Sequence, residues 1–157
     1  MRFILLLQFL LVSLSVGVSL AQASQVNLNS PVGYWKTIDD VTGEQKSILK
    51  ITENSDHVLT GQVFKAFPSP GEEPHKICSE CKDEKHNQPI VGMVILTGLK
   101  QDNEQWDGGK ILDPLNGKYY SCSARVMDGG KKLKVRGYIG FSLLGRSQDW
   151  IRAPDIN

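Results

Sequence analysis

The chain has 157 residues, of which 40% are hydrophobic and 22% are charged, and its formal net charge at pH 7 is +1. This length is sufficient for one domain and too short for two ordinary ones. A net charge near zero argues against a nucleic-acid-binding protein, because such proteins normally carry a basic excess that meets the phosphates.

The first 23 residues have the pattern of a secretory signal peptide. Arg2 precedes an apolar run over residues 3–20, and a small-x-small cleavage site ends at Ala23. A transmembrane anchor is the alternative, but polar residues dilute the run and no basic stop-transfer cluster follows it. We expect cleavage after Ala23 and a periplasmic or secreted protein without a membrane span. Residues 24–30 are polar and predict a flexible arm ahead of one domain over residues 31–153.

Turn signals separate eight short β-rich runs in the rest of the chain. The predicted strands cover residues 33–38, 46–52, 58–67, 91–99, 105–112, 118–127, 131–139 and 147–152. The run from Val91 to Leu99 is apolar on both faces, which predicts a central strand that is covered on both sides. Leu133 and Val135 alternate with basic residues, which is typical of a half-buried strand.

The connections favour hairpins between consecutive strands. Asp128-Gly129-Gly130 and Asn116-Gly117 supply the positive-φ positions that tight turns need. Residues after the signal contain no convincing apolar face with helical spacing. We therefore predict an all-β fold, a single up-and-down antiparallel β-barrel of about eight strands, because closure removes the exposed edges of a sheet.

Several blocks resemble the bacterial family known as domain of unknown function 2147. They are residues 33–40, 43–47, 78–81, 89–93, 108–114, 116–118 and 135–140, with Gly145, Arg146 and Trp150. The resemblance covers nearly the whole predicted domain. It implies an exported protein with a lipocalin-like (calycin-like) barrel, and it implies no established chemistry.

Gly33-x-Trp35 in the first strand is similar to the lipocalin signature. In that superfamily a basic residue from the end of the last strand packs over the tryptophan. Arg152 is the matching residue here, with Arg146 as the reserve candidate. A guanidinium on an indole face is a physically sensible closure for the bottom of a barrel.

Cys78 and Cys81 form a Cys-x-x-Cys motif with three interpretations. A structural disulfide is the default in an oxidising compartment. A redox dithiol is the second, although the surrounding acidic residues should raise a thiol pKa. The third is a tetrahedral metal site formed with His75 and His86. The remaining cysteine, Cys122, lies on one strand face with Tyr120 and Ala124, which predicts burial as a small apolar group.

Aromatic and basic residues near the strand ends are the candidate ligand-binding residues. They are Trp35, Arg136, Tyr138, Phe141, Arg146 and Trp150. The alternative is that the tryptophans and Phe141 belong to the core. Arg136 and Tyr138 share a strand face. If that face points inward, the arginine needs an anionic partner, either Asp113, Asp39 or a ligand carboxylate; if it points outward, Arg136 is a surface residue.

No motif predicts catalysis or a cofactor, and we expect a protein that is not an enzyme. Asp39 and Asp40 are adjacent, so on a strand they would face opposite ways, and a turn-capping role fits them better than acid–base chemistry. His57 lies in a polar turn and is expected to be exposed to solvent.

Three hypotheses for function follow. The first is an exported barrel that binds a small amphipathic or hydrophobic ligand, with Arg136 or Arg146 as the polar anchor. The second is an envelope or host interaction protein with a filled barrel, acting through residues 68–89 or through the basic stretch from Lys131 to Arg152. The third is a thiol–disulfide or metal-handling protein centred on Cys78 and Cys81.

Overall fold

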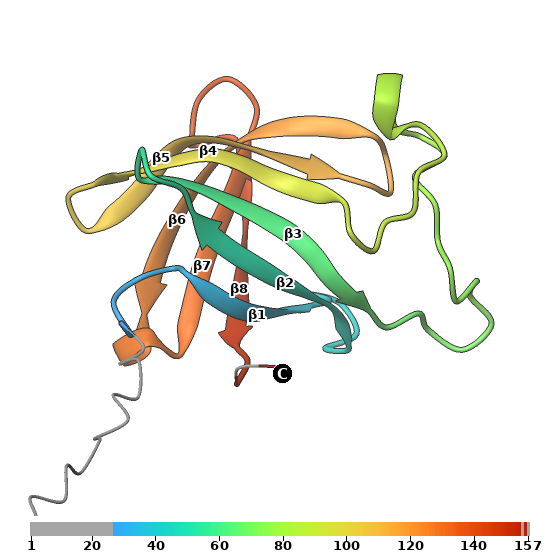
Figure 1. Ribbon diagram of the computed structural model, residues 1–157, viewed down its shortest axis with the longest axis horizontal. Helices are drawn as coiled ribbons and strands as arrows, with labels where there is room; N and C mark the ends of the chain where they lie inside the picture. Colours follow the sequence, from blue (N-terminus) through green and yellow to red (C-terminus); the bar gives the residue numbers. More distant parts are fainter. Residues whose placement is uncertain (1–26, 155, 157) are drawn as a thin grey trace, which may run out of the picture.

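Eight antiparallel strands form a closed barrel in the computed structural model, which describes residues 27–154 and 156 (Figure 1). The strands are β1 (Gly33–Ile38), β2 (Gln45–Glu53), β3 (Val58–Ala66), β4 (Val94–Asp102), β5 (Gln105–Asp113), β6 (Lys118–Met127), β7 (Lys132–Tyr138) and β8 (Gly145–Arg152). Each strand pairs with its neighbour in sequence, and β8 pairs with β1 to close the barrel. The predicted all-β, up-and-down barrel is confirmed.

The fourth strand differs from the prediction. It begins at Val94 instead of Val91, and the exposed Val91 and Val94 rule out a strand that is covered on both sides. The reason is a turn over residues 90–93, in which the Met93 amide donates to the Ile90 carbonyl at 3.1 Å. Outward residues of a small barrel face solvent, so an apolar run does not by itself indicate a covered outer face.

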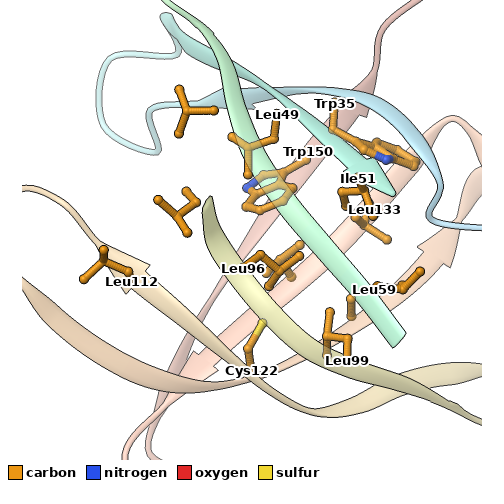
Figure 2. Close-up of a cluster of buried hydrophobic side chains, with 14 of the residues drawn as sticks. Trp35, Leu49, Ile51, Leu59, Leu96, Leu99, Leu112, Cys122, Leu133 and Trp150 are labelled. Atoms are coloured by element: carbon orange, nitrogen blue, oxygen red, sulfur yellow. The ribbon is translucent and has the colours of Figure 1, made fainter. Parts of the chain in front are cut away.

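The core lies inside the barrel and takes buried side chains from all eight strands (Figure 2). On β7, Leu133 and Val135 are buried while Lys132, Lys134 and Arg136 remain partly exposed, so the predicted alternation is confirmed. The strand register places Leu133 opposite Trp150 of β8, which is also buried. The alternation follows from the two-residue period of a strand, which sends successive side chains to opposite faces.

One end of the barrel is closed by Trp35 and Arg152. The Arg152 guanidinium lies 4.2 Å from the centre of the Trp35 ring, and the indole Nε1 donates to the Pro31 carbonyl at 2.7 Å. Arg152 also donates to the carbonyls of Ser30 at 2.8 Å and Val32 at 3.1 Å. The predicted packing of Arg152 over the tryptophan is therefore confirmed.

The opposite end is open and carries the longest connection, residues 67–93 between β3 and β4. This segment contains the short helix η1 (Asp83–Lys85) and extends beyond the barrel at the right of Figure 1. It folds against the β5–β6 turn. Gly117 of that turn has φ +66°, and a Cβ there would lie 1.8 Å from the Glu80 carbonyl oxygen. Only glycine permits both this backbone conformation and this approach.

The predicted signal peptide over residues 1–23 lies outside the described residues, as do residues 24–26 of the predicted arm. Residues 27–30 form a turn, in which the Ser30 amide donates to the Asn27 carbonyl at 3.0 Å. Within residues 27–154 and 156, no helix has the length and apolar character needed to cross a membrane.

Candidate functional site

A cavity of about 1080 Å³ occupies the open end of the barrel. Its apolar wall comes from buried side chains of several strands: Leu49, Val63, Ile95, Leu112, Val135 and Trp150. The hairpin topology brings these residues together, because alternating inward positions on eight neighbouring strands converge on one interior. The deeper half of the barrel is packed, with Trp35, Ile51 and Leu133 near one another (Figure 2).

Three small residues lie side by side across β5, β6 and β7. Cys122 of β6 pairs with Gly109 of β5 and with Gly137 of β7. A Cβ at Gly109 would lie 2.6 Å from Leu99 Cγ, so the Leu99 side chain already fills that space. A Cβ at Gly137 would meet its nearest side chains, those of Ile111 and Tyr120, at an ordinary 3.6 Å. Gly137 therefore faces room that a side chain could occupy.

Arg146 and Asp40 form an ion pair at the mouth of the cavity. The Arg146 Nε donates to Asp40 Oδ2 at 2.8 Å, and Arg146 Nη2 contacts the same oxygen. Gln148 Nε2 donates to this carboxylate at 3.4 Å and its Oε1 accepts from Trp150 Nε1 at 3.2 Å. A chain of polar contacts thus runs from the rim to the buried indole, and it fixes the Trp150 side chain as a wall of the cavity.

The other cations of the lining are also paired with carboxylates. Lys76 Nζ lies 2.8 Å from Glu72 Oε1, and Lys46 Nζ lies 3.3 Å from Glu44 Oε2. Hydrogen bonding from Lys76 lowers the pKa of Glu72, and the backbone amides of Thr42 and Val41 lower the pKa of Asp39. Both carboxyl groups are therefore ionised at neutral pH.

Acidic residues outnumber basic ones in the lining. The carboxylates are Asp39, Asp40, Glu72, Glu73 and Asp113, and the cations are Lys46, Lys76 and Arg146. Since each of the three cations already contacts a carboxylate, the mouth as a whole is acidic.

The structure brings together three of the six candidate ligand-binding residues: Tyr138, Arg146 and Trp150 line the cavity. Trp35 lies at the closed end, and Phe141 is exposed in the β7–β8 loop. Arg136 is on the outer face of β7, where its Nε donates to the Ser142 carbonyl at 2.7 Å and its Nη1 to the Ser147 hydroxyl at 3.1 Å. Arg136 therefore points outward and is a surface residue, and the alternative of an inward arginine with an anionic partner is wrong.

Asp39 has the turn-capping role that the sequence suggested. Its Oδ1 accepts from the Val41 amide at 3.0 Å and from the Thr42 amide at 2.8 Å. His57 is exposed, as predicted, and its Nδ1 lies 2.9 Å from Glu53 Oε1. Asp39 lines the cavity, but its Oδ1 is engaged by the amides of its own turn, and His57 lies in the β2–β3 turn at the closed end. The two residues are therefore not placed together for acid–base chemistry.

The predicted disulfide between Cys78 and Cys81 is confirmed, with both residues buried. Bonded sulfurs are not thiolates, so the alternative metal site with His75 and His86 is not formed. A thiol–disulfide exchange site needs an accessible sulfur. The buried sulfurs instead favour a structural role, in which the bridge shapes the segment that packs on Gly117.

Cys122 is buried, as predicted. Burial, with a smaller contribution from the negative charge of Asp107, raises the pKa of its thiol to about 12. This thiol therefore stays protonated and unreactive at neutral pH.

Sequence reasoning missed Gly137, Gln148 and Glu72 as cavity residues. A glycine within a strand does not by itself indicate a cavity, and no local pattern predicts that Gln148 contacts Asp40, 108 positions away. These assignments needed the closed barrel, which brings β8 beside the β1–β2 loop.

The comparisons with known proteins agree with this architecture. Residues 33–152 match the family described as "Uncharacterized protein conserved in bacteria (DUF2147)". A similar solved structure is described as "Protein HP1028 from the human pathogen Helicobacter pylori belongs to the lipocalin family". The two share 17% sequence identity with a TM-score of 0.66, over 79% of this chain and 83% of that one, which shows a common fold. No curated protein matches the chain.

Proposed function

The chain belongs to the bacterial family DUF2147, and we propose that it is an exported barrel protein that binds one small amphipathic or hydrophobic molecule in its open-end cavity. The observation that carries the proposal is the cavity of about 1080 Å³ with its buried apolar wall. Eight strands leave an interior that is either just filled or able to hold one small ligand. Cavities that hold small ligands in proteins are typically about 300–1,000 Å³ and mainly apolar.

Two further observations support this proposal. The similar Helicobacter pylori protein is described as a lipocalin, and the fold is the one that places a ligand in the mouth of a barrel. The Cys78–Cys81 disulfide is consistent with an oxidising, extracytoplasmic compartment.

The charges at the mouth favour a ligand whose polar end is neutral or cationic. A carboxylate ligand would have to displace Asp40 from Arg146 or Glu72 from Lys76, and it would meet the remaining acidic side chains. An uncharged or ammonium group can instead contact Asp40 while the ion pair stays intact. Arg146 then acts by holding Asp40 in place.

Binding can be tested with the neutral fluorescent probe N-phenylnaphthylamine and a cavity-filling variant. Gly137→Leu extends a side chain into the cavity from a position with an unstrained backbone, where the new Cβ would make only ordinary contacts, at 3.6 Å, with Ile111 and Tyr120. We expect it to weaken probe binding at least about tenfold, because it removes apolar volume that the probe would occupy. Ser121→Leu is the matched control, since it adds the same bulk on the outer face of the adjacent β6.

Competition then tests the polar end of the ligand. We expect dodecyltrimethylammonium to displace the probe at lower concentration than dodecanoate. Equal probe binding by Gly137→Leu, Ser121→Leu and the unaltered protein would place the probe outside the cavity and contradict the proposal. If dodecanoate is the better competitor, the assigned charge of the polar end is wrong, while the cavity remains the binding site.

A further inference from the structure

The exposed apolar side chains of this barrel are concentrated at its open end. The β1–β2 loop carries Val41, which is 90% exposed, and the β5–β6 turn carries Leu115. The β7–β8 loop carries four more, Ile139, Phe141, Leu143 and Leu144. The closed-end turns, at residues 54–57, 103–104 and 128–131, consist of polar residues and glycine. Beside the last of them, the exposed apolar side chains are Leu28 and Met127, which are 51% and 37% exposed. Loops that only face water have no need of apolar side chains at one end of the barrel. Exposed apolar groups that cluster in space mark interaction surfaces.

The β7–β8 loop has the features of a segment that inserts shallowly into a lipid bilayer. Residues 137–145 contain no charged side chain, and arginines flank them at positions 136 and 146. Phe141 and Leu143 are 80% and 88% exposed at the tip. An apolar tip can enter the acyl region while flanking guanidinium groups meet the lipid phosphates.

Arg136 is suited to the phosphate contact. The two acceptors to which it donates, the Ser142 carbonyl and the Ser147 hydroxyl, are uncharged, so neither neutralises its positive charge. The first of these contacts also ties the guanidinium to the apolar loop, which keeps the charge beside the tip. Figure 1 shows the loop, drawn in red-orange at the top of the view, projecting beyond the ends of β7 and β8.

The same loop forms part of the cavity wall. Ile139 and Leu144 line the cavity, whereas Phe141 and Leu143 do not. A bilayer that accepts the tip would therefore lie against the cavity mouth. We propose that the β7–β8 loop, residues 139–144, docks the open end of the barrel on a phospholipid bilayer, with Phe141 and Leu143 inserted and Arg136 on the phosphates.

The test is flotation of the full protein with vesicles of equal parts phosphatidylcholine and phosphatidylethanolamine, whose zwitterionic headgroups offer phosphates to Arg136 without placing net negative charge opposite the acidic cavity mouth. We expect the unaltered protein to float with the vesicles and Phe141→Ser/Leu143→Ser to bind about a hundredfold more weakly, about tenfold for each large apolar side chain. Met127→Ser, which removes an exposed apolar side chain at the closed end, serves as the control and should float normally.

A second measurement locates the loop directly. In Phe141→Trp, the fluorescence of the new tryptophan should be quenched by lipids brominated in the acyl chains, because the residue inserts among them. The native tryptophans are buried in the barrel, so the quenching reports on position 141. A protein that fails to float, a double variant that floats like the unaltered protein, or an unquenched Trp at position 141 would each overturn the proposal. The proposal would also be overturned if the unaltered protein did not bind vesicles but self-associated with increasing concentration, and if the double substitution abolished that self-association.

This inference and the ligand-binding proposal fail separately. Phe141 and Leu143 lie outside the cavity lining, so Phe141→Ser/Leu143→Ser should bind N-phenylnaphthylamine with unchanged affinity. Conversely, Gly137→Leu should float with vesicles while its probe binding is weakened.

Discussion

Arg152 lies over the Trp35 ring, 4.2 Å from the ring centre, and joins the last strand of the barrel to the first. The same guanidinium donates to the Ser30 and Val32 carbonyls, so it also secures the segment that enters β1. Register contributes to this closure, because Trp35 and Arg152 are directly paired between β1 and β8. One side chain therefore contributes a cation–π contact and several hydrogen bonds at the seam of the barrel.

Arg152→Ala should lower the free energy of unfolding by about 2–3 kcal/mol, because it removes the ring contact and leaves partly buried carbonyls without their donor. The stability of Arg152→Lys should lie between those of the unaltered protein and Arg152→Ala, because an ammonium keeps the charge but cannot reproduce the planar set of donors. Urea denaturation followed by tryptophan fluorescence measures both. Arg125→Ala, which removes an exposed pair with Glu104, is the control and should change stability little. Equal effects of Arg152→Ala and Arg125→Ala would contradict the closure role.

Gly117→Ala should destabilise the protein more than Gly43→Ala. Both glycines have positive φ, +66° and +72°, so both substitutions carry the cost of placing alanine in the left-handed region, about 1 kcal/mol. Only at Gly117 does the new Cβ collide with a backbone atom, the Glu80 carbonyl oxygen. Thermal unfolding of the two variants isolates the collision. If their midpoints coincide, the segment over residues 67–93 does not pack on the β5–β6 turn in solution.

Cys78→Ala/Cys81→Ala should lower the free energy of unfolding by about 2 kcal/mol, the loop-closure value for so small a ring. Probe binding should persist, because neither cysteine belongs to the cavity lining. Denaturation and probe titration of the double variant measure the two effects. If the unaltered protein catalysed thiol–disulfide exchange and the double variant lost this activity while keeping its fold, the thiol–disulfide hypothesis would be supported instead.

Cys122 should make the protein less stable as pH rises from about 9 to about 12. Its native pKa of about 12 exceeds the unperturbed value of 9.0. In this window the unfolded chain has lost the thiol proton and the native protein retains it, so stability falls by about 1.4 kcal/mol per pH unit. Below pH 9 both states are protonated and the contribution is fully present.

The measurement compares urea denaturation with and without Cys122→Ala, in chains that lack Cys78 and Cys81 so that no disulfide can exchange. The difference in free energy of unfolding between the chain with Cys122 and the Cys122→Ala variant should shrink steadily above pH 9. The contributions of the other titrating groups are the same in both chains and cancel. Parallel curves across this range would show that the native thiol titrates normally.

The sequence by itself determined the eight strands, their order and most of their boundaries. The alternation of Leu133 and Val135 with basic residues, and glycine turns such as Asp128-Gly129-Gly130, are local signals that survive in any fold with these hairpins. The Cys78–Cys81 bridge and the Arg152–Trp35 contact were also predicted, from a compact motif and from the family resemblance. The start of β4 was not predicted correctly. The apolar run at Val91–Val94 shows composition alone, and it indicates neither the turn over residues 90–93 nor which side chains face water.

Only the tertiary structure decided which of these residues share a site. Closure of the barrel brings Arg146 of β8 to Asp40 of the β1–β2 loop, 106 positions apart. It also decides that the face of β7 shared by Leu133 and Val135 is the interior, which leaves the alternating Arg136 on the outer face. Closure further leaves room for a Cβ at Gly137, at ordinary contact distance from Ile111 and Tyr120, while the space at Gly109, in the same cross-strand row, is filled by Leu99. Local sequence fixes which way a side chain alternates along its strand. The position of a residue around the barrel depends on long-range pairing, and this pairing separates the cavity from the surface.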